Sequence, residues 1–268
     1  MNQIPEPPGS PRLFRPRTVG EILGDAFGLY TRHWRNLLAT VAVIVVPLAL
    51  VQVVLIDLVI GEAFEGGTTD PADSSIAAAV VASLAIAAIT VLMWALVTGA
   101  ITRAAAGTFL GRDLDVRESY RYGLARFGSI LLVGLLAALA IGAGFIALVI
   151  PGLFVLTRLT CALPALVVEG RRGRQALSRS WNLVAGRGWP VFGTIIVAGL
   201  LTGIVGSILT APLGDNTAVR AVGQSLSSVI TTPYMSLVGI LIYLDLRVRK
   251  EGYSPVGLDL DLAQNAAP

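Results

Sequence analysis

The chain has 268 residues, of which 54% are hydrophobic and only 14% are charged. Soluble domains carry about 25% charged residues, so this composition indicates an integral membrane protein. The net charge is only +3 and the basic residues flank apolar runs, so we expect no nucleic-acid partner. One cysteine, Cys161, and one histidine, His33, exclude a disulfide framework and a CxxC zinc site, and no cofactor is expected.

The chain begins with a proline-rich segment, residues 1–17, which we predict to be a disordered cytoplasmic tail. Thr18 and Glu21 then form the T-x-x-E pattern of a capping box, which predicts a helix over residues 18–35. Apolar side chains recur at helical spacing along this segment, namely Val19, Ile22, Leu23, Ala26, Phe27 and Tyr30. Such an amphipathic helix would lie in the lipid headgroup region.

Six apolar runs make up most of the remaining chain, and all but the fourth, which is short for a span, are about long enough to cross roughly 30 Å of hydrocarbon. They cover residues 37–60, 76–101, 130–150, 153–168, 191–209 and 222–244. We therefore predict an all-α, polytopic membrane bundle of six transmembrane helices over residues 18–250, with a flexible cytoplasmic tail at 251–268. Pro151 and Gly152 are expected to separate the third and fourth runs. Two full crossings are favoured there, and a re-entrant hairpin remains the alternative.

The basic residues predict the orientation of the bundle. Eighteen of the 20 either precede span one or follow spans two, four and six. By the positive-inside rule both termini are cytoplasmic. Only Arg220 lies in a loop on the other side, and Arg158 lies within span four. Arginine outnumbers lysine nineteen to one, which suggests a bacterial protein, and we expect it in the inner membrane.

Two further amphipathic stretches, residues 107–127 and 174–185, lie on the predicted cytoplasmic side. Together with residues 18–35 they form a loose threefold pattern of amphipathic helix, aromatic residue and apolar hairpin. Trp34, Trp181 and Trp189 are predicted to be interfacial anchors, because tryptophan is enriched at membrane–water boundaries.

Ionisable residues within spans are the first candidates for function, since an unpaired charge is costly in lipid. Arg158 and Asp57 both fall in the predicted outer half of the bundle. They either meet in a polar site, or Arg158 reaches the outer headgroups while Asp57 lies at the interface. Pro47, Pro164 and Pro233 lie inside spans and are candidate helix kinks. A structural role is favoured for them.

The chain contains no phosphate-binding loop, no G-x-S-x-G elbow and no HExxH motif. The acidic loop after the first span does not have the spacing of a calcium loop and is expected to be a solvated linker. We therefore expect no catalytic residue and no metal site, and the protein is not predicted to be an enzyme.

Three stretches carry a resemblance to known proteins: RPRTVGEILGDAFGLYTRHWRNLLA, ALPALVVEGRRGRQALSRSWNLVAGRGW and YLDLRVRKEGY. They resemble a bacterial family of six-helix membrane proteins. It includes the membrane domain attached to some glycerophosphoryl diester phosphodiesterases and uncharacterised, stand-alone actinobacterial members. The resemblance covers about residues 16–253 and implies fold and topology. It does not imply the phosphodiesterase activity, which would need a separate barrel with two histidines.

The features above predict a non-enzymatic scaffold or accessory component of the membrane. Its amphipathic helices would dock membrane lipids, or another membrane or cytoplasmic protein. The alternative is a small transporter or lipid-handling permease with a polar site near Arg158.

Overall fold

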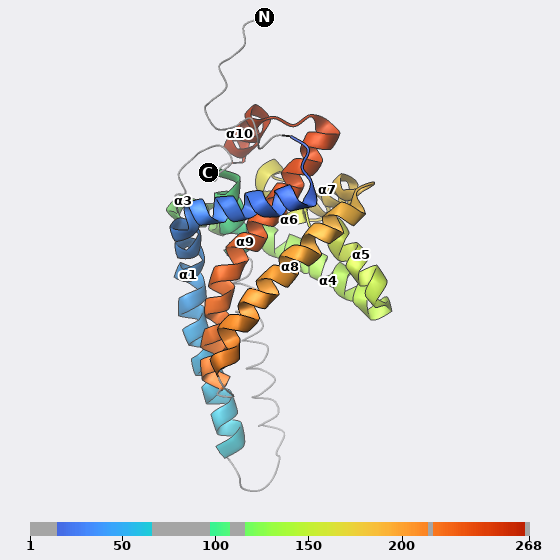
Figure 1. Cartoon of the computed structure of the whole chain (residues 1–268). Helices are drawn as coiled ribbons and strands as arrows, with labels where there is room; N and C mark the ends of the chain where they lie inside the picture. The colour runs from blue at the N-terminus through green and yellow to red at the C-terminus, as the bar shows by residue number, and fades with distance from the viewer. Residues whose placement is uncertain (1–14, 66–96, 108–115, 214–216, 266–268) are drawn as a thin grey trace, which may run out of the picture.

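The computed structural model describes residues 15–65, 97–107, 116–213 and 217–265 (Figure 1). Within these ranges the regular structure is helical throughout, which confirms the all-α prediction for this part of the chain. Four helical segments of the described residues are long and apolar enough to cross a membrane: Phe127–Ala147, Val149–Glu169, Gly188–Thr210 and Gly223–Glu251. Of the predicted second span, 76–101, only residues 97–101 lie within the described ranges.

Helix α1 (Val19–Glu65) consists of two parts that meet at His33, whose φ of −116° and ψ of 18° are not helical. The first part lies across the other helices and the second runs along the bundle (Figure 1). The predicted capping box is present, with the Thr18 N–H donating to Glu21 Oε2 at 2.8 Å and the Glu21 N–H donating to Thr18 Oγ1 at 3.4 Å. The backbone N–H of Thr18, followed by the Arg15 guanidinium, lowers the pKa of Glu21 to about 2.

Helix α9 (Thr217–Glu251) forms the centre of the bundle, and α1 and α8 (Gly188–Thr210) pack along it. Its residues from Leu237 to Leu246 are almost all buried. The buried side of the first part of α1, with Ile22, Ala26 and Leu29, joins the same core. The core around α9 is therefore closely packed and apolar.

The third predicted run ends in a tight hairpin between α4 (Phe127–Ala147) and α5 (Val149–Leu159). The break lies at Leu148, which has an extended backbone (φ −171°, ψ 162°), and not at Pro151 as the sequence suggested. Pro151 instead occupies the first turn of α5, where a missing N–H costs no hydrogen bond. Gly152 faces Gly144 so closely that a Cβ on Gly144 would lie 2.9 Å from the Gly152 Cα.

The fourth predicted run, 153–168, is divided by a break at Thr160 and Cys161 into α5 and α6 (Ala162–Glu169). Ser180 of α7 (Arg174–Val184) bridges this break. Its Oγ accepts from the Cys161 N–H at 3.0 Å and donates to the Arg158 carbonyl at 2.7 Å. The side chain thus satisfies backbone groups that the break releases.

Helix α7 is held against the end of α9, because Lys250 Nζ donates to the carbonyls of Asn182 at 2.8 Å and Ala185 at 2.7 Å. Arg158 contacts α7 as well. The 11 residues of α5 that separate this level from the hairpin tip extend about 16 Å. That is about half of a hydrocarbon core of roughly 30 Å. In Figure 1 the hairpin points sideways and stops short of the level at which α1 ends.

The predicted tails are more ordered than expected where the structure describes them. Residues 255–264 of the predicted flexible tail form α10 (Pro255–Gln264), with Leu258 and Leu262 buried in the core. This apolar pair at helical spacing is short and lies among acidic residues, so the sequence signal is weak. From the N-terminal tail, Arg17 is buried and its N–H donates to Asp245 Oδ1 at 2.6 Å. Arg17 and α10 therefore lie at the same end of α9.

Candidate functional site

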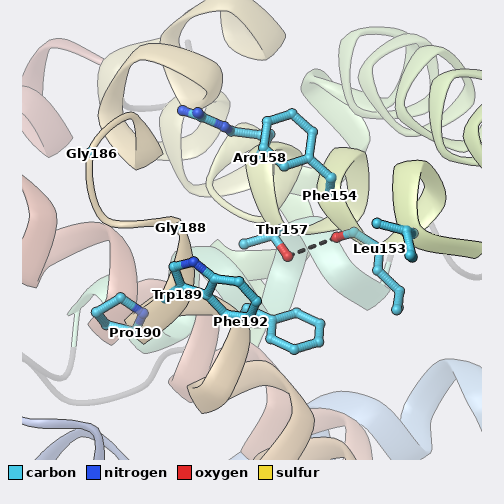
Figure 2. A pocket seen from close by; sticks show the side chains of 10 residues that line it. Leu153, Phe154, Thr157, Arg158, Gly186, Gly188, Trp189, Pro190 and Phe192 are labelled. Carbon is cyan, nitrogen blue, oxygen red and sulfur yellow. Dashed lines mark hydrogen bonds between the residues drawn. The ribbon is translucent and has the colours of Figure 1, made fainter.

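A groove of about 760 Å³ opens between α5 and the corner that joins α7 to α8 (Figure 2). Its α5 wall and its α7–α8 wall together consist of Ile150, Leu153, Phe154, Thr157, Arg158, Gly186, Gly188, Trp189, Pro190 and Phe192. The Thr157 hydroxyl donates to the Leu153 carbonyl at 2.7 Å, so it is already satisfied within α5. Apart from Arg158, the walls present mainly carbon.

Arg158 is the one ionisable side chain of the groove wall and is half-buried. Its Nη1 donates to the Trp181 carbonyl at 3.3 Å, and its guanidinium lies 5.0 Å from the ring centre of Phe154 and 5.3 Å from that of Trp181. The Nε is buried without a hydrogen-bond partner. Among the described residues no carboxylate pairs with this guanidinium.

Aromatic side chains give the groove its shape. Trp189 is 84% exposed and meets Phe192 edge to face, with ring centres 6.0 Å apart. On the opposite wall Phe154 meets Trp181 edge to face at 5.7 Å. A cationic group at one end of an aromatic, apolar groove suits a molecule with an anionic head and a hydrocarbon tail.

A second groove, of about 740 Å³, lies on the other side of the α4–α5 hairpin, towards α8 and α9. Its lining is aliphatic, with residues such as Leu135, Ile141 and Leu163, and none of its lining residues is ionisable. The hairpin is therefore flanked by apolar grooves on both sides.

A buried cluster of charged residues joins α6, α7, α9 and α10, and we call it the Glu169 cluster. Its members are Glu169, Arg179, Tyr243, Arg247, Glu251, Tyr253 and Asp261. The Glu169 side chain is only 7% exposed. It accepts from Arg179 Nε at 2.8 and 2.9 Å and from the Tyr243 hydroxyl at 2.8 Å.

Arg247 connects the Glu169 cluster to α10. Its Nη1 donates to Asp261 Oδ2 at 2.7 Å and its Nε donates to Glu251 Oε2 at 2.8 Å. The guanidinium also lies 3.5 Å from the ring centre of Tyr253, whose hydroxyl donates to Asp261 at 2.7 Å. Burial and this bond to Asp261 raise the pKa of Tyr253 well above its usual range, so the phenol stays a donor.

A second cluster, the Asp245 cluster, fixes the N-terminal segment on α9. Asp245 accepts from the Arg17 N–H through one oxygen and from Arg249 Nε at 2.8 Å through the other. Arg17 Nε pairs with Asp25 Oδ2 at 3.1 Å, and Arg249 Nη2 donates to the Arg17 carbonyl. The start of α1 is therefore attached to the end of α9 by charged hydrogen bonds.

Helix α3 (Val116–Ala125) is attached by Tyr122, which the sequence analysis did not select. Leu124 of the same helix is 64% exposed, whereas Tyr122 is buried. The Tyr122 hydroxyl donates to the Val167 carbonyl at 3.1 Å, and Arg103 and Arg126 lie over its ring. A buried tyrosine with a satisfied hydroxyl outweighs the hydrophobic pattern here.

The structure places the remaining predicted site residues apart from one another. Asp57 lies in α1, but its side chain is outside the described residues, so a pairing with Arg158 stays a prediction. Arg158 lies beside α7, at the level of the Lys250 end of α9. Its placement in the outer half of the bundle stays a prediction.

The three prolines occupy different settings. Pro47 lies in α1 with an exposed side chain, and the non-helical residue of that helix is His33. Pro164 is buried in the first turn of α6, and Pro233 is buried inside α9, which continues through it. Of the predicted anchors, Trp34 directly follows the break in α1 and is 51% exposed.

Sequence reasoning did not select the two charged clusters, because Glu169 and Asp245 lie just beyond the ends of predicted spans 153–168 and 222–244. The available signal was the short spacing between each acid and nearby arginines, in E-G-R-R and D-L-R-V-R. Within the described ranges no group of three or more His, Cys, Asp or Glu side chains is arranged to hold a metal ion.

Comparison with known protein families gives a match to one region of the chain. Residues 118–244, just under half of the chain, match a family described as Domain of unknown function (DUF7847). The match contains Arg158 and Glu169 and ends one residue before Asp245, so it leaves out α10. No curated protein and no solved structure matches the chain. The resemblance to the phosphodiesterase-linked membrane family stays a prediction.

Proposed function

We propose that the protein is a non-enzymatic, multi-pass component of a bacterial inner membrane that acts as a scaffold for a membrane or cytoplasmic partner. The observation that carries the proposal is the pair of charged clusters, which lock α1, α6, α7, α9 and α10 into one polar layer. A layer fixed in this way offers a rigid docking surface at one end of the bundle.

The arrangement in the membrane is inferred from the helix lengths together with the contacts that α5 makes with α7. We infer four crossings, by the second part of α1, the apolar run at 76–101, α8 and α9. The α4–α5 hairpin enters from the cytoplasmic side and returns to it, since its α5 arm covers only about half of the hydrocarbon core. Length and composition alone would let both arms cross as in the six-span prediction, but the contacts of Arg158 and Ser180 with α7 favour re-entry.

The scaffold role predicts a protein contact on the outer surface of the polar layer. A photo-crosslinking amino acid at Leu124 should give a discrete crosslinked protein in living cells, because Leu124 is 64% exposed on α3, which Tyr122 attaches to α6 of the polar layer. The matched control is Leu200, 61% exposed on the apolar helix α8, which should give lipid adducts and no discrete protein band. Identical patterns at the two positions, or crosslinks to the protein itself alone, would contradict the scaffold role.

A second function, lipid handling, is favoured by the groove that reaches Arg158. The groove is open on one side and lined by carbon, so it suits a lipid better than a soluble polar solute. Reconstitution of the purified chain into liposomes tests this function. Lipid movement or substrate flux at the rate of empty liposomes would count against it.

A further inference from the structure

Arg158 differs from the other half-buried or buried arginines whose partners are known in this fold. Arg179, Arg247 and Arg249 each form an ion pair with a carboxylate in the polar layer. Arg158 has only a carbonyl and two aromatic rings within the described part of the chain. A guanidinium prefers a bidentate anionic partner, so its geometry leaves room for an external anion.

The depth of Arg158 indicates which anion. Its guanidinium lies beside α7, which Lys250 holds at the end of α9. In the proposed membrane arrangement this is the level of the cytoplasmic headgroups, where anionic lipids gather. The groove leads along α5 from Arg158 past Phe154 and Thr157 to Leu153 (Figure 2). Ile150, near the hairpin tip, also lines it. The groove therefore runs from the headgroup level towards the hydrocarbon core.

We propose that the groove between α5 and the α7–α8 corner is a binding site for one anionic phospholipid. The phosphate would bind Arg158, and an acyl chain would lie along the aromatic walls. The negative head complements the one cation of the groove wall, and the apolar lining accepts the chain. The exposed ring of Trp189 forms part of the α8 wall of the groove. This inference rests on the proposed membrane arrangement, and it does not depend on a protein partner.

Native mass spectrometry of the full chain, released from detergent with added dioleoylphosphatidylglycerol or dioleoylphosphatidylcholine, tests the site. We expect one phosphatidylglycerol to be retained per chain in preference to phosphatidylcholine. Arg158→Leu should weaken phosphatidylglycerol retention about tenfold, as expected for loss of a charge-assisted pair. Arg174→Leu is the matched control, because Arg174 is exposed on α7 away from the groove wall, and it should leave retention unchanged.

Two further variants test the site even if Arg158→Leu does not fold. Arg158→Lys keeps the charge and should retain the preference for phosphatidylglycerol. Trp189→Ala changes an exposed side chain and should weaken retention of both lipids. The proposal is overturned if the wild type retains the two lipids equally, or if Arg158→Leu retains phosphatidylglycerol as well as the wild type does. Displacement of the lipid by millimolar inorganic phosphate also overturns it, because the site would then bind free phosphate. A failed crosslink at Leu124 would leave all these outcomes unaffected.

Discussion

Replacement of Glu169 by alanine is expected to lower the free energy of unfolding by about 3–5 kcal/mol, the usual cost of removing one partner of a buried ion pair. The Glu169 carboxylate is 7% exposed and accepts hydrogen bonds from Arg179 and from the Tyr243 hydroxyl. Without it Arg179 keeps only Glu251, and the Tyr243 hydroxyl loses its acceptor in a buried position. Urea unfolding of the detergent-solubilised protein, followed by circular dichroism, measures the change.

The matched control for Glu169→Ala is Gln264→Ala, which removes an exposed polar side chain from α10 in the same polar layer. Exposed substitutions usually change stability by less than about 0.5 kcal/mol. Because Glu169 joins the end of α6, which α10 contacts, to Arg179 of α7 and Tyr243 of α9, its loss should also increase protease cleavage around α10. Equal midpoints for the two variants would mean that the Glu169 cluster does not hold the layer together.

Gly144→Ala is expected to destabilise the protein by about 1–3 kcal/mol, the usual cost of overpacking. An alanine Cβ at this position would lie 2.9 Å from the Gly152 Cα and 3.2 Å from the Pro151 carbonyl oxygen. These are backbone atoms, so the α4–α5 hairpin must open to make room. The same urea titration measures the loss, and a disulfide or crosslink between the two arms would form more slowly in the variant.

Gly142→Ala provides the control for the hairpin, because a Cβ at Gly142 meets nothing within 4 Å. Alanine is a better helix former than glycine, so this variant should be as stable as the wild type or more stable by up to about 1 kcal/mol. The two substitutions lie only two residues apart, yet they should change the free energy of unfolding in opposite directions, because only the Cβ at Gly144 meets backbone atoms. Destabilisation of the same size at both positions would argue against a close contact between Gly144 and Gly152.

Local rules predicted the first part of the chain well. Thr18 and Glu21 form the expected capping box, and the amphipathic helix ends at His33, close to the predicted boundary. These features depend on residues that are neighbours in the sequence. Composition and the length of the apolar runs are also properties of continuous sequence, and they predicted a helical fold with helices that can cross a membrane.

Features that depend on distant residues could not be predicted in this way. The hairpin turns at Leu148 because Pro151 is tolerated in a first helical turn, and proline alone does not indicate which position it takes. Asp245 lies next to Arg17 only after folding, since 228 positions separate them. The depth of Arg158 depends on the break at Cys161, which Ser180 of another helix stabilises. These contacts determine where the candidate site lies.

The accessibility of the hairpin tip tests the proposed arrangement most directly. A cysteine replaces Leu148, which is 68% exposed at the tip, in a chain whose native Cys161 is changed to alanine. Intact cells are then treated with a membrane-impermeant maleimide. A cysteine at Thr68, in the loop predicted to be external, should react and serves as the positive control. The re-entrant arrangement predicts no labelling of Leu148→Cys from outside, and labelling as strong as at Thr68 would contradict it.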